Sequence, residues 1–245
     1  FAGWAAGEPA EVLLVDADER WQAGPMASNT LGQHHDFLVG LAEVTPTRRL
    51  DSTSNHAIVA GAVELAAYPV AVWALGEEST EHDAMSEAEQ VILAAYVAGG
   101  GALLVSAAEL LYALDDRASP ADQRFVAEVL RAGYAADDAG TQEFSGIPAG
   151  PFADVALASF HTPDGLPIEF PDVLTPMTGA GPLVEYIGGT GGAAVVGYQD
   201  VGRVIVPGFP VEAILSGTVR GAFLEAAYTY LGLPPASSAR STGGS

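Results

Sequence analysis

Four short runs of apolar residues, separated by helical patterns, constrain the fold of this chain more than any other feature. They lie at residues 11–15, 69–75, 102–105 and 203–206. The runs are nearly continuous and do not alternate with polar residues, so both faces of each strand should be buried. Strands of this kind are typical of parallel sheets covered by helices on both sides. The pattern therefore predicts an α/β fold: a three-layer α/β/α sandwich around a mostly parallel sheet.

Helical spacing fills much of the chain between these runs. Apolar stripes with a period of 3.6 residues predict helices within residues 29–43 and 219–231. A third helix should begin after Ser86, because Glu89 completes a capping box three residues later. A fourth should begin after Ser119, which a proline follows. Further strands are expected around 48–52, at 183–187 and at 192–198.

The acidity of the chain limits its partners. The 31 Asp and Glu residues outnumber the 9 Lys and Arg residues, which gives a formal net charge of −22. Nucleic acids and anionic membrane surfaces both attract basic segments, so we expect neither as a partner. With no Cys, the chain has no disulfide, no thiolate metal site and no Cys nucleophile. The five His show no spacing typical of a zinc site.

One uncharged stretch has nearly the length of a membrane span. Residues 91–108 carry no charge, but three consecutive glycines interrupt them at 99–101. A helix that ends at a glycine turn, followed by a buried strand, is the better interpretation. We therefore expect no membrane span.

Polar side chains follow three of the predicted strands. The carboxyl ends of parallel strands meet at one edge of a sheet, where ligands bind in open α/β folds. This places the candidate residues together. The ligand-binding candidates are Asp16, Asp18, Trp21, Glu77 and Glu109, and the catalytic candidates are Ser106 and Glu78. Trp21 is either a platform for a sugar ring or a cover for the edge of the core.

The acidic candidates leave three interpretations open. Carboxylate oxygens suit Ca²⁺ or Mg²⁺, although Asp16 and Asp18 do not form an EF-hand loop. A carboxylate pair can also hydrolyse a glycosidic bond. Alternatively, the acids cap helix N-termini, where negative charge is favourable. We expect no cofactor, with Ca²⁺ as the alternative.

Four segments carry a resemblance to a known family: residues 72–80, 86–90, 99–106 and 202–212. Together they resemble the class I glutamine-amidotransferase-like domains of secreted bacterial proteins of the golvesin-like and xanthan-lyase-like kind. The resemblance spans about residues 11–233. It implies a flavodoxin-like sandwich and a secreted or cell-surface location. Residues 1–10 would then be a linker or the end of a preceding module, and residues 234–245 a flexible linker.

The catalytic positions of active amidotransferases can be followed in this resemblance. Their Cys nucleophile corresponds to Ser106 or Ala107, and their His corresponds to Pro210, while Glu212 matches their Glu. A Ser hydroxyl without a positioned base is a poor nucleophile. The resemblance thus implies a non-catalytic accessory domain, whose partners are neighbouring modules and a carbohydrate or cell-surface ligand. The alternative is a hydrolase of polysaccharide or cell-wall substrates that acts through carboxylates or Ser106.

Overall fold

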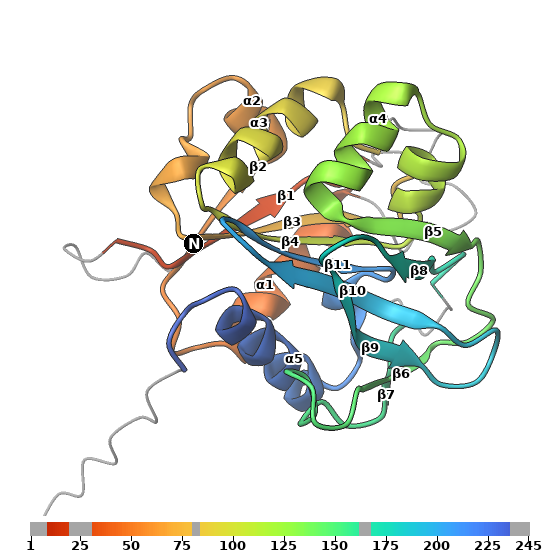
Figure 1. Cartoon of the computed structure of the whole chain (residues 1–245). Helices are drawn as coiled ribbons and strands as arrows, with labels where there is room; N and C mark the ends of the chain where they lie inside the picture. The colour runs from red at the N-terminus through yellow and green to blue at the C-terminus, as the bar shows by residue number, and fades with distance from the viewer. Residues whose placement is uncertain (1–8, 20–30, 80–83, 162–167, 236–245) are drawn as a thin grey trace, which may run out of the picture.

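The computed structural model describes residues 9–19, 31–79, 84–161 and 168–235. Within them the strands form one twisted sheet in the order β2-β1-β3-β4-β11-β10-β9-β6-β7. In addition, β8 pairs with β10, and β5 pairs with β8. Helices cover both faces of this sheet, as Figure 1 shows. Trp21 lies outside the described residues.

Half of the sheet is parallel and comes mainly from the N-terminal part of the chain. β1 lies between β2 and β3, and β4 lies between β3 and β11, all in parallel register. The bounds are Val12–Asp16 for β1, Leu50–Ser54 for β2, Val70–Gly76 for β3, Ala102–Ala107 for β4 and Arg203–Pro207 for β11. Their carboxyl ends therefore share one edge.

The other half of the sheet is antiparallel, so the sheet is mixed rather than mostly parallel. β10 pairs antiparallel with β9, β11 and β8, and β6 pairs antiparallel with β7 and β9. The bounds are Ala132–Ala136 for β5, Glu143–Gly146 for β6, Ala158–Ser159 for β7, Val173–Pro176 for β8, Gly181–Tyr186 for β9 and Ala193–Gln199 for β10. The connections on either side of β10 are too short for a parallel crossover. Four glycines with positive φ, between 188 and 192, form the turn before β10.

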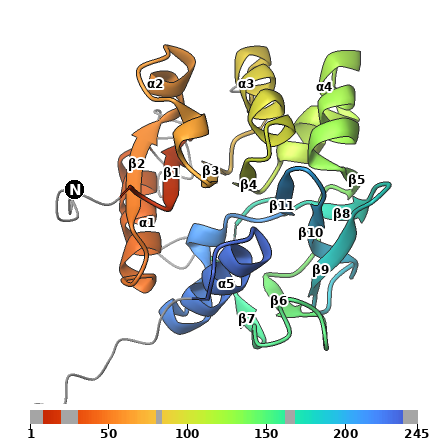
Figure 2. The ribbon, with the colours of Figure 1, turned by 60° about the vertical axis from the view of Figure 1, so that its left-hand side comes forward.

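Two groups of helices cover the two faces, as the turned view of Figure 2 also shows. α1 (Leu31–Val44) and α5 (Gly217–Tyr230) pack on one face. α2 (Asn55–Val59), α3 (Glu87–Ala98) and α4 (Pro120–Phe125) pack on the other. Single turns complete the chain: η1 (Leu65–Ala67), η2 (Tyr112–Asp116), η3 (Val126–Leu130) and η4 (Val211–Ala213). This arrangement confirms the α/β/α sandwich.

The core confirms that the apolar runs are buried on both faces. In β1, Val12 and Leu14 face α1 and α5, whereas Leu13 and Val15 face the opposite helices. β3 and β4 alternate in the same way, and the ring of Trp73 is fully buried. Burial on two sides stabilises each strand through about 25 cal/mol per Å² of apolar surface removed from water.

Local signals set the helix starts as expected. Ser86 and Glu89 form a capping box at α3, and Ser119 with Asp122 forms one at α4. The uncharged stretch becomes the end of α3, a glycine turn and β4. Across the described ranges, no helix is long and apolar enough to cross a membrane.

Candidate functional site

The parallel strands bring the candidate residues to one edge of the sheet. Asp16 ends β1, and Asp18 follows it into a buried position. Glu77 and Glu78 follow β3 and are also buried. Ser106 lies near the end of β4, and Glu109, half-buried, follows that strand. The edge is therefore acidic, with a single Ser hydroxyl at its centre.

Ser106 is bonded to a residue 106 positions away in the chain. Its Oγ donates to Oε2 of Glu212 over 2.6 Å and accepts from the backbone N–H of Val211 over 2.8 Å. Glu212 belongs to η4, which follows β11, the strand next to β4. Both side chains are buried, with exposed fractions of 0% and 1%. The fold thus places a carboxylate against Ser106 and buries both side chains.

Glu212 is one of two site residues that were not among the candidates from the sequence. The family resemblance had already matched it to a catalytic Glu, and that match was the available signal. Pro210, at the position of the missing His, precedes η4 as its N-cap residue. A proline side chain cannot take a proton, and in this chain the Ser106 hydroxyl donates to Glu212.

The two consecutive glutamates after β3 hold two separate loops. Oε1 of Glu78 accepts from the backbone N–H of Glu19, and Oε1 of Glu77 accepts from that of Glu169, each over 2.6 Å. Charge-assisted bonds to backbone N–H groups are short and about twice as strong as neutral ones. Glu77 and Glu78 therefore act as anchors for the chain on both sides of the β3 end.

A short segment, residues 168–172, lies over the strand ends, and we call it the cover segment. Its first residue exchanges two hydrogen bonds with the side chain of Gln142, and its last donates its N–H to the carbonyl of Ala108. A Cβ at Gly208 would lie 2.1 Å from the carbonyl oxygen of Asp172. The missing side chain at Gly208 lets the cover segment rest on the end of β11.

Asp172 of the cover segment is a site residue that no sequence pattern indicated. Its Oδ2 accepts from the N–H groups of Leu111 and Tyr112 over 2.8 and 3.3 Å. Burial raises the pKa of the Asp172 carboxyl well above 3.8, and the nearby Glu109 and Asp137 raise it further. The two backbone bonds act in the opposite direction. A single Asp in a loop has no periodicity, so only the fold could reveal its burial.

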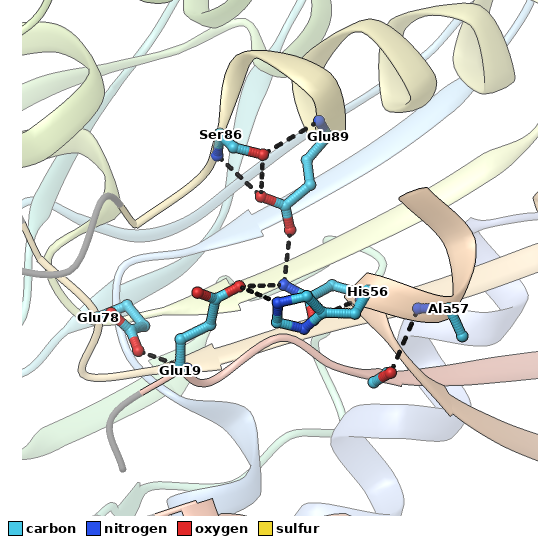
Figure 3. A network of polar contacts seen from close by, with 8 residues as sticks. Glu19, His56, Ala57, Glu78, Ser86 and Glu89 are labelled. Carbon is cyan, nitrogen blue, oxygen red and sulfur yellow. Dashed lines mark hydrogen bonds and ion pairs between the residues drawn. The ribbon is translucent and has the colours of Figure 1, made fainter. Parts of the chain in front are cut away.

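A polar network extends from this edge to the start of α3, as Figure 3 shows. Nδ2 of Asn55 donates to Glu19 Oε1 over 2.8 Å and to Glu89 Oε1 over 3.0 Å. Oε2 of Glu89 accepts from both the N–H and the hydroxyl of Ser86. His56 lies 3.7 Å from Glu19. Glu89 thus caps the start of α3, and Glu19 joins the strand-end edge to Asn55 at the start of α2.

The candidate acids do not meet as a metal site within the described ranges. There, no group of three or more His, Asp and Glu side chains has an arrangement that could hold a metal ion. The acids of this edge are instead arranged one by one along the strand ends, and several accept hydrogen bonds from backbone N–H groups.

The fold, but not the sequence, matches known proteins. No family model matches the chain, and no curated protein matches it. A putative ThuA-like protein from Bacteroides uniformis is 13% identical with a TM-score of 0.55, and the match covers 94% of this chain and 95% of that one. The N-terminal domain of mmIFT52 is also 13% identical, with a TM-score of 0.55 over 90% and 96% of the two chains.

A larger enzyme has the same fold as part of its chain. The GH42 β-galactosidase Gan42B from G. stearothermophilus is 14% identical with a TM-score of 0.59. The match covers 93% of this chain but 31% of that one, so this chain spans about a third of that enzyme's length. At these identities the comparisons show the fold alone, an α/β sandwich.

Proposed function

We propose that this chain is a non-catalytic accessory domain, structural or ligand-binding, of a longer exported bacterial protein. One observation carries the proposal: the Ser106 hydroxyl, at the position of an amidotransferase nucleophile, is fully buried and makes both of its hydrogen bonds inside the protein. A nucleophile must reach the carbonyl or glycosidic carbon of its substrate. Pro210 at the position of the catalytic His supports the same conclusion.

The acids and the comparisons support an accessory role. Glu77 and Glu78 anchor loops through backbone N–H groups. The same fold forms about a third of a longer glycosidase, which fits a domain that works beside others. The segments that resemble golvesin-like and xanthan-lyase-like proteins favour a domain over residues 11–233, a secreted or cell-surface location, and neighbouring modules as partners.

Labelling by a fluorophosphonate, which reacts with activated serines, tests this proposal. We expect no labelling of Ser106 in the wild type, and no hydrolysis of glutamine, peptidoglycan or plant and bacterial polysaccharides. The inactive control is Ser106→Ala. Labelling that disappears in both Ser106→Ala and Glu212→Gln would overturn the accessory role.

A hydrolase is the second candidate, because one observation favours it. The 2.6 Å bond from Ser106 to Glu212 gives the hydroxyl a carboxylate partner that can take its proton. This candidate requires a local opening of the fold that exposes the buried Ser106. It predicts that labelling appears under conditions that promote local opening, such as low urea concentrations, whereas the accessory role predicts none.

We also propose that the domain needs no metal cofactor. One carboxylate oxygen of Glu77 and one of Glu78, Oε1 in each, already accept short hydrogen bonds from backbone N–H groups. A ligand that binds the native state raises its melting temperature. We expect Ca²⁺ and EDTA to leave the melting temperature unchanged. A melting temperature that rises when Ca²⁺ is added and falls again with EDTA would contradict this.

A further inference from the structure

Phe170, in the middle of the cover segment, combines exposure with a costly backbone conformation. Its side chain is 45% exposed, and its φ of 48° lies in the left-handed region. A bulky residue there is a true outlier, and the following proline favours an extended conformation instead. Such a conformation is unfavourable for a bulky residue and persists only where the surroundings impose it.

The other non-glycine residues with positive φ in the described chain have ordinary reasons. Arg131, with φ of 51°, ends η3, where a left-handed residue is common. Ala149, with φ of 64°, occupies a tight turn closed by the bond from the Gly150 N–H to the Ile147 carbonyl. Phe170 neither ends a helical turn nor lies in a hydrogen-bonded tight turn, so its conformation needs another explanation.

Anchors on both sides hold the backbone at Phe170 in place. Before it, the Glu169 N–H is bonded to Glu77. After it, the Pro171 carbonyl accepts from Ala139, and the Asp172 N–H donates to Ala108. The cover segment therefore holds the backbone of a partly exposed aromatic residue at the edge where α/β folds bind ligands. Glu169, the preceding residue in the sequence, is also exposed.

Three arginines of this protein each lie over an aromatic ring and pair with a nearby carboxylate. In the described chain, Arg48 lies over the ring of Tyr228, Arg117 over that of Tyr112 and Arg131 over that of Tyr198, at 5.7, 5.5 and 4.1 Å. Each of these Arg residues also pairs with an acid within four residues of the ring: Glu225, Asp116 and Asp200. Among the described residues, Phe170 beside Glu169 has the ring and the acid, but no cation lies over its face.

We propose that Phe170 and Glu169 form a binding site for an Arg or Lys side chain of a partner protein. This inference rests on the accessory role proposed above and names the chemistry of its ligand. The net charge of −22 attracts basic segments from a distance, while the ring and the carboxylate select the contact point. The partner is therefore a basic segment that lies across the strand-end edge.

A fluorescent peptide with two arginines separated by glycines tests the site. Its affinity is measured by anisotropy at low salt, against the same peptide with neutral citrulline in place of arginine. We expect the arginine peptide to bind more tightly, and Phe170→Ala and Glu169→Gln each to weaken it about two- to five-fold. Val201→Ala, 70% exposed in the turn before β11, and Glu128→Gln, exposed on η3, are the matched controls and should change nothing.

Three outcomes would overturn the proposal. Phe170→Ala could bind the arginine peptide as the wild type does. Glu128→Gln could weaken binding as much as Glu169→Gln, which would mean general attraction to an acidic surface. A neutral oligosaccharide such as cellohexaose could bind with a dependence on Phe170, which would make the ring a sugar platform. None of these depends on labelling of Ser106, so the accessory role is tested separately.

Discussion

Individual residues at the strand ends use their polarity to hold the fold together. Ser106 and Glu212 join the ends of two neighbouring strands, and Asp172 joins the cover segment to the start of η2. A buried polar group without a partner costs about 1–3 kcal/mol, so the pairing of Ser106 with Glu212 stabilises the fold. Polar residues at a ligand-binding edge can therefore have a purely structural role.

Replacing Ser106 should destabilise the protein without a change in fold. Ser106→Ala removes the hydroxyl donor of Glu212 and the acceptor of the Val211 N–H. We expect a loss of about 1–3 kcal/mol in the free energy of unfolding, measured with urea. Glu212→Leu, which leaves no acceptor for the hydroxyl, and the Ser106→Ala/Glu212→Leu double mutant complete a thermodynamic cycle. A coupling energy of zero would contradict a direct bond.

Asp172 should make stability depend on pH. Its pKa is raised in the folded state, so between pH 3.8 and that raised value the folded protein binds more protons than the unfolded one. The contribution of Asp172 to the free energy of unfolding therefore falls as the pH rises through this window. In Asp172→Asn, the Asn side chain keeps an oxygen that accepts from the Leu111 and Tyr112 N–H groups, but it cannot ionise.

The expected result is that Asp172→Asn gains stability relative to the wild type as the pH rises from about 4. Urea unfolding at several pH values measures this difference. Asp138→Asn, a change of the same kind at an exposed residue, is the control. A difference between Asp172→Asn and the wild type that stays constant with pH would refute the raised pKa.

At the scale of elements, local signals predicted most of the sandwich. The capping box at Ser86, the helix start at Ser119 and the apolar runs of β1, β3, β4 and β11 are present as expected. β2 begins two residues later than expected, at Leu50. Strands β5 to β8, of two to five residues, were not predicted, because such short segments among glycines and prolines show no period.

The cover segment should depend on the glycine beneath it. In Gly208→Ala the new Cβ would lie 2.1 Å from the Asp172 carbonyl oxygen, so the segment must shift. We expect a loss of about 1–3 kcal/mol in unfolding free energy and faster hydrogen exchange at the Asp172 N–H. Gly181→Ala is the control, because a Cβ there has no atom within 4 Å. Equal effects at both positions would refute the role of Gly208.

At the scale of the whole molecule, the charge opposes folding. The 31 acids and 9 bases give a net charge of −22, and like charges repel more in the compact state than in the unfolded chain. Several ion pairs offset this locally, such as that of the buried Arg48 with Glu225 on α5. The remaining repulsion between exposed acids is sensitive to salt, because it acts across solvent.

Salt should therefore stabilise this protein. We expect the melting temperature to rise by several degrees between 0.02 and 0.5 M NaCl, as the Debye length falls from about 20 Å to about 4 Å. Sucrose at matched osmolality separates screening from general solvent effects. A melting temperature that falls with NaCl would show that attractive ion pairs outweigh the repulsion.

The sequence by itself determined the class of fold, the two-sided burial of the main strands, the helix starts and the acidic edge. These follow from apolar periodicity and capping, which act between residues a few positions apart. Only the tertiary structure decided that half of the sheet is antiparallel, that Glu212 contacts Ser106 across 106 residues, and that Asp172 is buried. Contacts of this kind depend on strand order and loop placement, which the whole chain settles as it buries both faces of one sheet.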